Sequence, residues 1–427
     1  MPEQLLTESA PVSRTSNPPA GPSCRFCSTP LRETFVDLGM SPLCETYPAA
    51  SDLNRGESYY PLHVYVCGEC FLVQLEEYES AESIFSDYAY FSSYSESWLR
   101  HADTYCGKMQ SRFGLGKDSF AVEVASNDGY LLQYFVQRGI PVLGIEPAAN
   151  VAQVAIGKGV PTRIAFFGAQ LASDLRAEGR AADLVLGNNV LAQVPDLNDF
   201  VEGLQILLKP EGVLTLEFPH LLKLMEHNEF DTIYHEHFSY FSLFTTIRVM
   251  EAHGLRVFDV EELASHGGSL RVYACRAAAS HPAESAVARI LADEQQAGLH
   301  TLAGYRGFAG QVLQTKLALL EFLIGAARAG KSVAGYGAPG KSATLLHSCG
   351  IGKDLIPWTV DRSPYKQGRF LPGTHIPIFH PDRIREEKPD YVVILPWNLQ
   401  SEIMKQLQYI REWGGKFVIP VPTTRVL

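Results

Sequence analysis

The chain has 427 residues, of which 46% are hydrophobic and 19% charged, a composition typical of a globular protein with two or three domains. The net charge of −11 and the absence of any run of lysine or arginine exclude nucleic acid and anionic membrane surfaces as partners. No segment is apolar over the roughly eighteen residues that a membrane-spanning helix requires.

Residues 1–20 are rich in Ser, Thr, Pro and Ala, which predicts a disordered lead-in. They lack the basic and apolar regions of a signal peptide, so a cytoplasmic location is expected. Eight cysteines follow, and four of them form two CxxC pairs. This usage is typical of metal binding in a reducing compartment and not of a disulfide framework.

The two CxxC pairs predict a structural zinc site within residues 21–80. Its ligands would be Cys24, Cys27, Cys67 and Cys70. Each pair presents two thiolates to one tetrahedral ion, and four thiolates leave no position open for catalysis. The long segment between the pairs predicts a small sheet or an elaborated hairpin. A pair of buried or redox-active cysteines is the alternative interpretation.

An aromatic segment, residues 87–95, connects this module to a helix expected near residues 95–112. It contains Tyr88 and Tyr90 among several serines. These side chains either line a pocket or pack as a linker against a neighbouring domain.

Residues 119–275 alternate between expected strands and helices, which predicts a parallel sheet covered on both faces. The first strand breaks at Ala125-Ser126-Asn127-Asp128-Gly129, so that backbone amides lie over a ligand. The second strand ends at Glu146, an acid suited to ribose hydroxyls. The expected strands are 119–124, 142–147, 160–165, 182–189 and 212–217, followed by an antiparallel pair at 255–263 and 269–275.

Residues 217–242 combine histidines and carboxylates with aromatic side chains around Tyr234-His235-Glu236-His237. Such a mixture suits a site that moves protons, because an apolar wall shifts a pKa and a carboxylate fixes an imidazole tautomer. In an extended chain His235 and His237 would share one face, whereas in a turn all four side chains could converge. Two alternatives are a half-buried segment with satisfied polar groups and a metal site using the His-x-His pair.

A second α/β unit begins near residue 331, after a largely helical region at 283–329. The loop Gly335–Ser342 fits both GxGxxG and GxxxxGK[ST], and we interpret it as a cradle for a diphosphate. An NTPase is disfavoured, since too little chain follows for its second carboxylate motif. The strand ending at Asp361 and the cationic turn around Lys366 complete this candidate site.

Taken together, these motifs resemble the S-adenosylmethionine-dependent C-methyltransferases of nucleotide-linked 4-keto deoxysugars. The resemblance rests on the CxxC pairs, on residues 123–129 and 189–192, on Tyr234-His235-Glu236-His237-Phe238, and on 335–342 with 366–368. It implies an α/β fold with a zinc-binding module (21–80), a class I methyltransferase domain (81–300) and a Rossmann-like domain (301–427) that holds the nucleotide sugar. S-adenosylmethionine and structural zinc are the implied cofactors, and a dTDP-linked sugar and a monomeric state are expected.

The resemblance also implies roles for individual residues. The catalytic candidates are His237, Glu236, Tyr234 and Tyr88. The cofactor candidates are Glu123, Ala125, Ser126, Asn127, Gly129, Glu146, Pro147 and Asn189. The substrate candidates are Tyr90, Gln193, His235, Tyr336, Gly337, Lys341, Ser342, Asp361 and Lys366. Two of these depart from the family pattern, which commonly has histidine at the position of Gln193 and aspartate at that of His235.

The expected mechanism begins at a ketone, which acidifies the adjacent ring carbons. His237 removes the C3 proton, Glu236 orients His237, and Tyr234 or Tyr88 donates to the enolate oxygen. The carbanion then takes the methyl group. Alternative interpretations are an O- or N-methyltransferase on a related sugar, an NAD-dependent sugar oxidoreductase using Gly335–Gly340, and a non-enzymatic zinc-ribbon adaptor.

Overall fold

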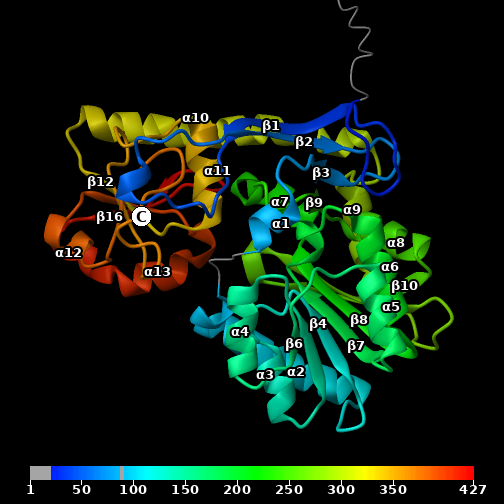
Figure 1. Ribbon diagram of the computed structural model, residues 1–427. Coiled ribbons are helices and arrows are strands. Elements are labelled where there is room, and N and C mark those ends of the chain that lie inside the picture. The colour runs from blue at the N-terminus through cyan, green and yellow to red at the C-terminus, as the bar shows by residue number, and fades with distance from the viewer. Residues whose placement is uncertain (1–20, 87–90) are drawn as a thin grey trace, which may run out of the picture.

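The computed structural model describes residues 21–86 and 91–427, which form three sheets with their associated helices (Figure 1). The first sheet belongs to the N-terminal module, the second to the middle of the chain and the third to the C-terminal part. The α/β fold class expected from the sequence is confirmed. The domain boundaries expected at residues 20, 80 and 300 stay predictions.

The first sheet is antiparallel and includes one strand from far along the chain. Its last strand follows Tyr234-His235-Glu236-His237, and Tyr240 pairs with Val73. This pairing fixes the histidine-rich segment to the N-terminal module. The strand order is β1 (Glu33–Ser41), β2 (Tyr60–Val66), β3 (Val73–Leu75) and β9 (Ser239–Tyr240).

The second sheet has seven strands, and five of them are parallel, as the alternating pattern predicts. The antiparallel pair expected at its end is also present. Its order is β10 (Leu255–Leu263), β11 (Ser269–Arg276), β8 (Leu208–Pro219), β7 (Ala182–Asn188), β4 (Ala121–Val124), β5 (Val142–Ile145) and β6 (Thr162–Arg163).

Helices cover both faces of this sheet because its strands are apolar on both sides. Phe135 and Tyr105 pack against one face, and Leu175 and Leu204 against the other. The first face carries α2 (Glu96–Phe113), α3 (Leu132–Gln137) and α4 (Ala149–Gly157). The second carries α5 (Ala169–Ala177), α6 (Leu197–Leu207), α8 (Leu243–Ala252) and α9 (Ser285–Gln296).

The third sheet is parallel except for its last strand, and one long helix ties it to the N-terminal module. Phe308 at the start of that helix stacks on Phe35 of β1, with ring centroids 4.5 Å apart (Figure 1). The strand order is β14 (Ile378–Phe379), β13 (Thr359–Val360), β12 (Val333–Tyr336), β15 (Tyr391–Ile394), β16 (Lys416–Ile419) and β17 (Arg425–Val426). Its helices are α10 (Phe308–Arg328), α11 (Gly340–Cys349), α12 (Arg383–Glu387) and α13 (Gln400–Gln406).

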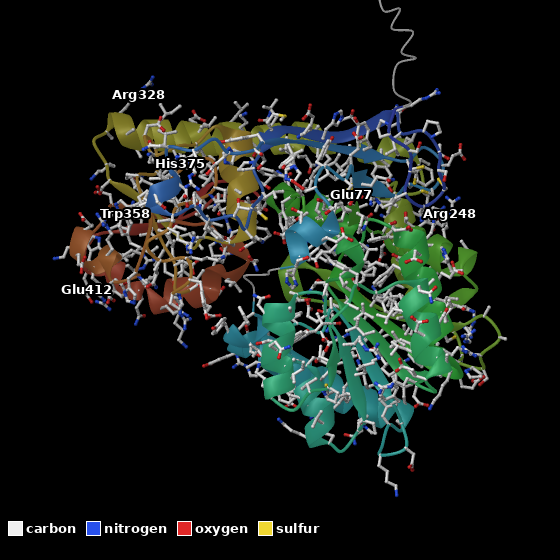
Figure 2. The ribbon with its side chains drawn as sticks, in the orientation of Figure 1. Glu77, Arg248, Arg328, Trp358, His375 and Glu412 are labelled. Atoms are coloured by element: carbon white, nitrogen blue, oxygen red, sulfur yellow. The ribbon has the colours of Figure 1, made fainter. Side chains whose placement is uncertain are left out.

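The short helices α1 (Ala81–Phe85) and α7 (Leu221–Glu226) lie between the N-terminal module and the second sheet (Figure 1). Side chains surround the ribbons of all three sheets in the described part of the chain (Figure 2), and a large cavity lies among them. None of the helices in the described parts of the chain combines the length and the apolar composition needed to cross a bilayer.

The carboxyl ends of both parallel sheets line this cavity, which has a volume of about 730 Å³. Asn127, Glu146 and Asn189 follow strands of the second sheet, and Gly337 and Asp361 follow strands of the third. Open α/β sheets bind ligands at this edge. Here two such edges share one cavity, so ligands held at the two edges would lie side by side.

Candidate active site

The four cysteines of the N-terminal module meet at one point, with all their Sγ atoms within 4.8 Å of one another. Tetrahedral Zn–S bonds of about 2.3 Å require sulfur separations of roughly 3.8 Å, so the thiolates fit a zinc ion. The two knuckles repeat one backbone geometry. Ser28 and Phe71, which follow the second cysteine of each pair, both have φ near 61° and donate their N–H to the carbonyl of the first cysteine.

Backbone amides and a buried acid form the wall of the cavity next to β4 and β5. The Glu146 carboxylate accepts the N–H of Asn127 and of Ala148, each at 2.9 Å. Each oxygen keeps a lone pair that a ribose hydroxyl can use. Asn127 and Asn189 have φ of 50° and 57°, a left-handed conformation that turns the chain sharply after each strand. These residues fit the adenosine part of S-adenosylmethionine.

The predicted cofactor residues divide into two groups. Ala125, Asn127, Glu146, Pro147 and Asn189 line the cavity. The other three, Glu123, Ser126 and Gly129, lie behind this wall.

The three residues behind the wall support the loop. Glu123 is fully buried against Tyr130, and burial raises the pKa of its carboxyl well above the usual range. Gly129 has φ of 73°, and a Cβ there would lie 3.1 Å from Val160. The loop thus requires glycine at this position.

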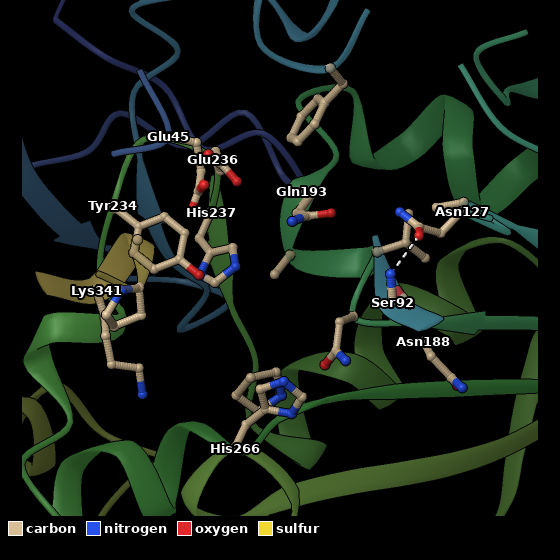
Figure 3. A pocket seen from close by; sticks show the side chains of 18 of the residues that line it. Glu45, Ser92, Asn127, Asn188, Gln193, Tyr234, Glu236, His237, His266 and Lys341 are labelled. Atoms are coloured by element: carbon tan, nitrogen blue, oxygen red, sulfur yellow. Dashed lines mark hydrogen bonds between the residues drawn. The ribbon is translucent and has the colours of Figure 1, made fainter. Parts of the chain in front are cut away.

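The segment Tyr234–His237 forms a turn that sends its side chains in different directions (Figure 3). Tyr234, Glu236 and His237 line the cavity. His235 does not, because its Nε2 lies 3.1 Å from the carbonyl oxygen of Pro61 in the N-terminal sheet. The segment thus adopts the turn and not the extended arrangement, and it brings together three of the four side chains, without His235.

His237 is held in a single tautomer by a backbone carbonyl. Its Nδ1 lies 2.9 Å from the oxygen of Thr232 and donates to it, so Nε2 keeps its lone pair. Burial lowers the pKa of His237 to about 4, and electrostatic interactions with His266 and Lys341 act in the same direction. His237 is consequently a neutral imidazole with an available acceptor nitrogen in the cavity.

Glu236 contacts the N-terminal module. The Cys44 thiol donates to Glu236 Oε1 at 3.3 Å, and the neighbouring Glu45 lies beside Glu236 at the top of the cavity in Figure 3. The hydrogen bond that orients His237 is the one that its Nδ1–H donates to the Thr232 carbonyl, so the orienting role expected for Glu236 stays a prediction. The zinc module thus contributes directly to the wall of the cavity.

The wall next to the third sheet contains a glycine loop and two lysines. The Asp361 carboxylate accepts the N–H of Ala338 at 2.7 Å and so holds the glycine loop in place. Lys366 Nζ donates to the Ala338 carbonyl and to the Tyr47 hydroxyl, both at 2.9 Å. Of the predicted substrate residues, Tyr336, Gly337, Lys341, Asp361, Lys366 and Gln193 line the cavity.

Ser342 and Lys341 depart from the expected diphosphate cradle. The Ser342 hydroxyl donates to the Pro339 carbonyl at 2.6 Å and is buried away from the cavity. Lys341 Nζ donates to Asn398 Oδ1 at 3.1 Å and lies 4.4 Å from the centre of the Trp397 ring. Tyr88 and Tyr90 fall outside the described residues.

Several cavity residues escaped the sequence analysis, among them Glu45, Trp98, Asn188, His266 and Arg362. Asn188 is the last residue of β7 and Arg362 lies two residues after β13, so the rule that sites gather at strand ends would have found them. Glu45 lies in the segment between the two cysteine pairs, whereas His266 lies in a hairpin. No local sequence pattern marks either residue.

Three families match successive parts of the chain. A zinc binding domain matches residues 24–85, a methyltransferase domain matches residues 98–260, and the C-methyltransferase C-terminal domain matches residues 264–422. The C-methyltransferase NovU of Streptomyces niveus is 38% identical over 404 residues, which cover 95% of this chain and 96% of NovU.

Solved methyltransferase structures match part of the chain. Magnesium protoporphyrin IX methyltransferase from Synechocystis PCC 6803, with S-adenosylmethionine bound, is 14% identical with a TM-score of 0.33, covering 42% of this chain and 79% of that one. An S-adenosylmethionine-dependent methyltransferase from Listeria monocytogenes is 14% identical with a TM-score of 0.33, and the match covers 42% of this chain and 99% of that one.

Proposed function

This chain belongs to the S-adenosylmethionine-dependent C-methyltransferase family, and from that premise we propose that it methylates C3 of a nucleotide-linked 4-keto-6-deoxysugar. S-adenosylmethionine supplies an electrophilic methyl group on a sulfonium. A sugar carbon accepts it only after losing a proton, because a C–H bond has no lone pair. A ketone at C4 makes that loss feasible, since the charge left on C3 spreads onto the oxygen.

One observation carries this proposal, namely the orientation of His237. Its Nδ1–H is engaged by the Thr232 carbonyl, and its Nε2 lone pair is available in the cavity. With a pKa of about 4, the imidazole is already deprotonated at neutral pH and ready to accept a proton. Methylation of an alcohol or amine also uses a base, but it has no need of a group that stabilises an enolate.

The nucleotide would lie against the third sheet. Helix α11 begins at Gly340 on the cavity wall, and its first amides have no side-chain cap. Uncapped amides at a helix N-terminus attract phosphate, and Arg362 and Lys366 add positive charge nearby. These groups support a dTDP-linked substrate even though the chain as a whole is acidic.

The test is solvent deuterium exchange into dTDP-4-keto-6-deoxyglucose, followed by NMR, with enzyme and S-adenosylhomocysteine in D2O. Exchange at C3 is the expected result. Exchange at C5 would support the same enolate chemistry but identify C5 as the methylated carbon. No exchange at either carbon, with methyl transfer still observed once the methyl donor is added, would favour an O- or N-methyltransferase.

A further inference from the structure

His266 enters the cavity from an unexpected direction, the hairpin between β10 and β11. Because β10 runs parallel to β8, this hairpin lies at the carboxyl edge of the second sheet. His266 lines the cavity opposite His237, with Lys341 to one side (Figure 3). Its backbone is left-handed, with φ of 56° and ψ of 21°. Residues other than glycine adopt this conformation at a cost, and such strain is concentrated at functional sites.

Close packing holds the hairpin in this conformation. Gly267 and Gly268 follow with φ of 94° and 143°. A Cβ on Gly267 would collide with the Glu229 carboxylate, and one on Gly268 would lie 2.8 Å from Lys223 Cβ. The hairpin therefore packs directly on Lys223 of α7 and on Glu229, which fixes the position of His266.

A buried ionic network anchors the other side of the hairpin. Ser265 donates to Glu217 Oε1 at 2.9 Å, and Arg271 and His101 contact Glu217 Oε2 at 2.7 and 2.9 Å. The Trp98 and His266 rings are nearly perpendicular, at 84°, with their centroids 5.4 Å apart. Within residues 21–86 and 91–427, neither ring nitrogen of His266 has a hydrogen-bond partner. The imidazole is thus rigidly held and has its hydrogen-bonding groups unused.

The proposed reaction needs a donor that His237 cannot provide. With Nδ1–H engaged by Thr232, His237 offers only a lone pair. It must approach C3 perpendicular to the carbonyl plane, because the breaking C–H bond has to overlap the π system. A donor to the oxygen prefers the carbonyl plane itself. Tyr234 packs on His237, with ring centroids 4.2 Å apart, and approaches from the same side. His266 approaches from another direction.

We propose that His266 is a second catalytic residue, whose N–H donates a hydrogen bond to the C4 oxygen as that oxygen becomes an enolate. This inference rests on the proposed function. The C3–H bond breaks and its proton goes to His237 Nε2. The electron pair forms the C3–C4 double bond while the C4–O π pair moves to oxygen. His266 keeps its proton, and the C3 electron pair later bonds to the methyl carbon.

The surroundings of His266 suit a neutral donor. Burial lowers its pKa to about 4, and the positive charge of Lys341 acts in the same direction. At neutral pH it therefore carries one N–H and one lone pair, and the nearby lysine charge stabilises negative charge on the oxygen.

The backbone conformation makes a clean test possible. Glycine and asparagine are the residues that best tolerate φ of 56°. H266G removes the donor without backbone strain, and H266N keeps a short amide donor. H227N is the matched control, because exposed His227 contacts the Gly267 carbonyl at 3.1 Å but does not line the cavity.

The experiment measures C3 deuterium exchange into dTDP-4-keto-6-deoxyglucose with S-adenosylhomocysteine bound. H266G should lower the maximal exchange rate by about 10²- to 10³-fold, with H266N intermediate and H227N near wild type. An H266G rate close to wild type, or a higher KM with kcat unchanged, would overturn the role of His266. No exchange by the wild-type enzyme, with methyl transfer still observed once the methyl donor is added, would instead overturn the proposed function, and this inference with it.

Discussion

Replacing His237 by asparagine isolates the role of its Nε2 atom. The amide nitrogen of asparagine occupies the position of the imidazole Nδ1, so it can still donate to the Thr232 carbonyl 2.9 Å away. The turn that carries Tyr234 and Glu236 should therefore remain in place. What disappears is the acceptor nitrogen in the cavity.

The magnitude follows from the loss of a general base. Such groups contribute about 10²- to 10⁴-fold to a rate, which corresponds to roughly 3–5 kcal/mol of transition-state stabilisation. Because the Thr232 hydrogen bond survives, the free energy of unfolding of H237N should fall by only about 1–2 kcal/mol. H237Q provides the converse comparison. The glutamine amide reaches the Nε2 position but no longer donates to the Thr232 carbonyl, so H237Q should be the less stable of the two variants.

The assay is C3 deuterium exchange with S-adenosylhomocysteine bound, combined with calorimetric binding of S-adenosylhomocysteine and denaturant unfolding. H237N should bind the cofactor product like wild type while exchange is lost. Near-normal exchange by H237N would refute the assignment of His237 as the base. An equal loss of cofactor affinity would show that the change had disturbed the second sheet.

Three further predictions concern pH, zinc and a buried carboxylate. With the pKa of His237 lowered to about 4, exchange should stay constant as pH falls through about 6.5 and decline only near 4; an apparent pKa near 6.5 would contradict the burial of this group. The stability that neutral His237 contributes should accordingly be complete above pH about 6.5 and be lost as the pH falls toward 4 in urea titrations. C67S should destabilise the N-terminal module and lower its zinc content, which emission spectrometry measures. An unchanged zinc content would exclude a four-cysteine site. W397F removes the indole N–H that donates to Asp231 Oδ2 at 2.6 Å, so it should lower the free energy of unfolding by about 1–3 kcal/mol. W413F removes a donor at a half-buried site and should lower it less. Equal losses would indicate lost ring packing instead.

Much of the fold could be predicted because its signals are local. The apolar segment near residue 120, the break at Ala125–Gly129 and the acid at Glu146 gave the order of strands and loops in the second sheet. Short strands of the third sheet, such as β14 and β16, were not predicted, since two to four apolar residues carry too little periodicity.

The candidate site was less predictable, because its residues come together through packing between distant segments. His235 and His237 are alike in sequence context, yet the turn directs one to the Pro61 carbonyl and the other into the cavity. Lys341 fits a phosphate motif, but Trp397 and Asn398 draw it away from the loop. A motif identifies a residue type, whereas its direction depends on neighbours far along the chain.

The sequence by itself determined the cysteine cluster, the parallel sheet and the segment that carries the proposed base, because cysteine spacing, strand alternation and turn residues act over a few positions. Only the tertiary structure decided that the edges of two sheets share one cavity and that Glu45 and His266 belong to its wall. The physical reason is that the left-handed backbone of His266 is maintained by α7 and the buried Glu217 network, which no local pattern around residue 266 encodes.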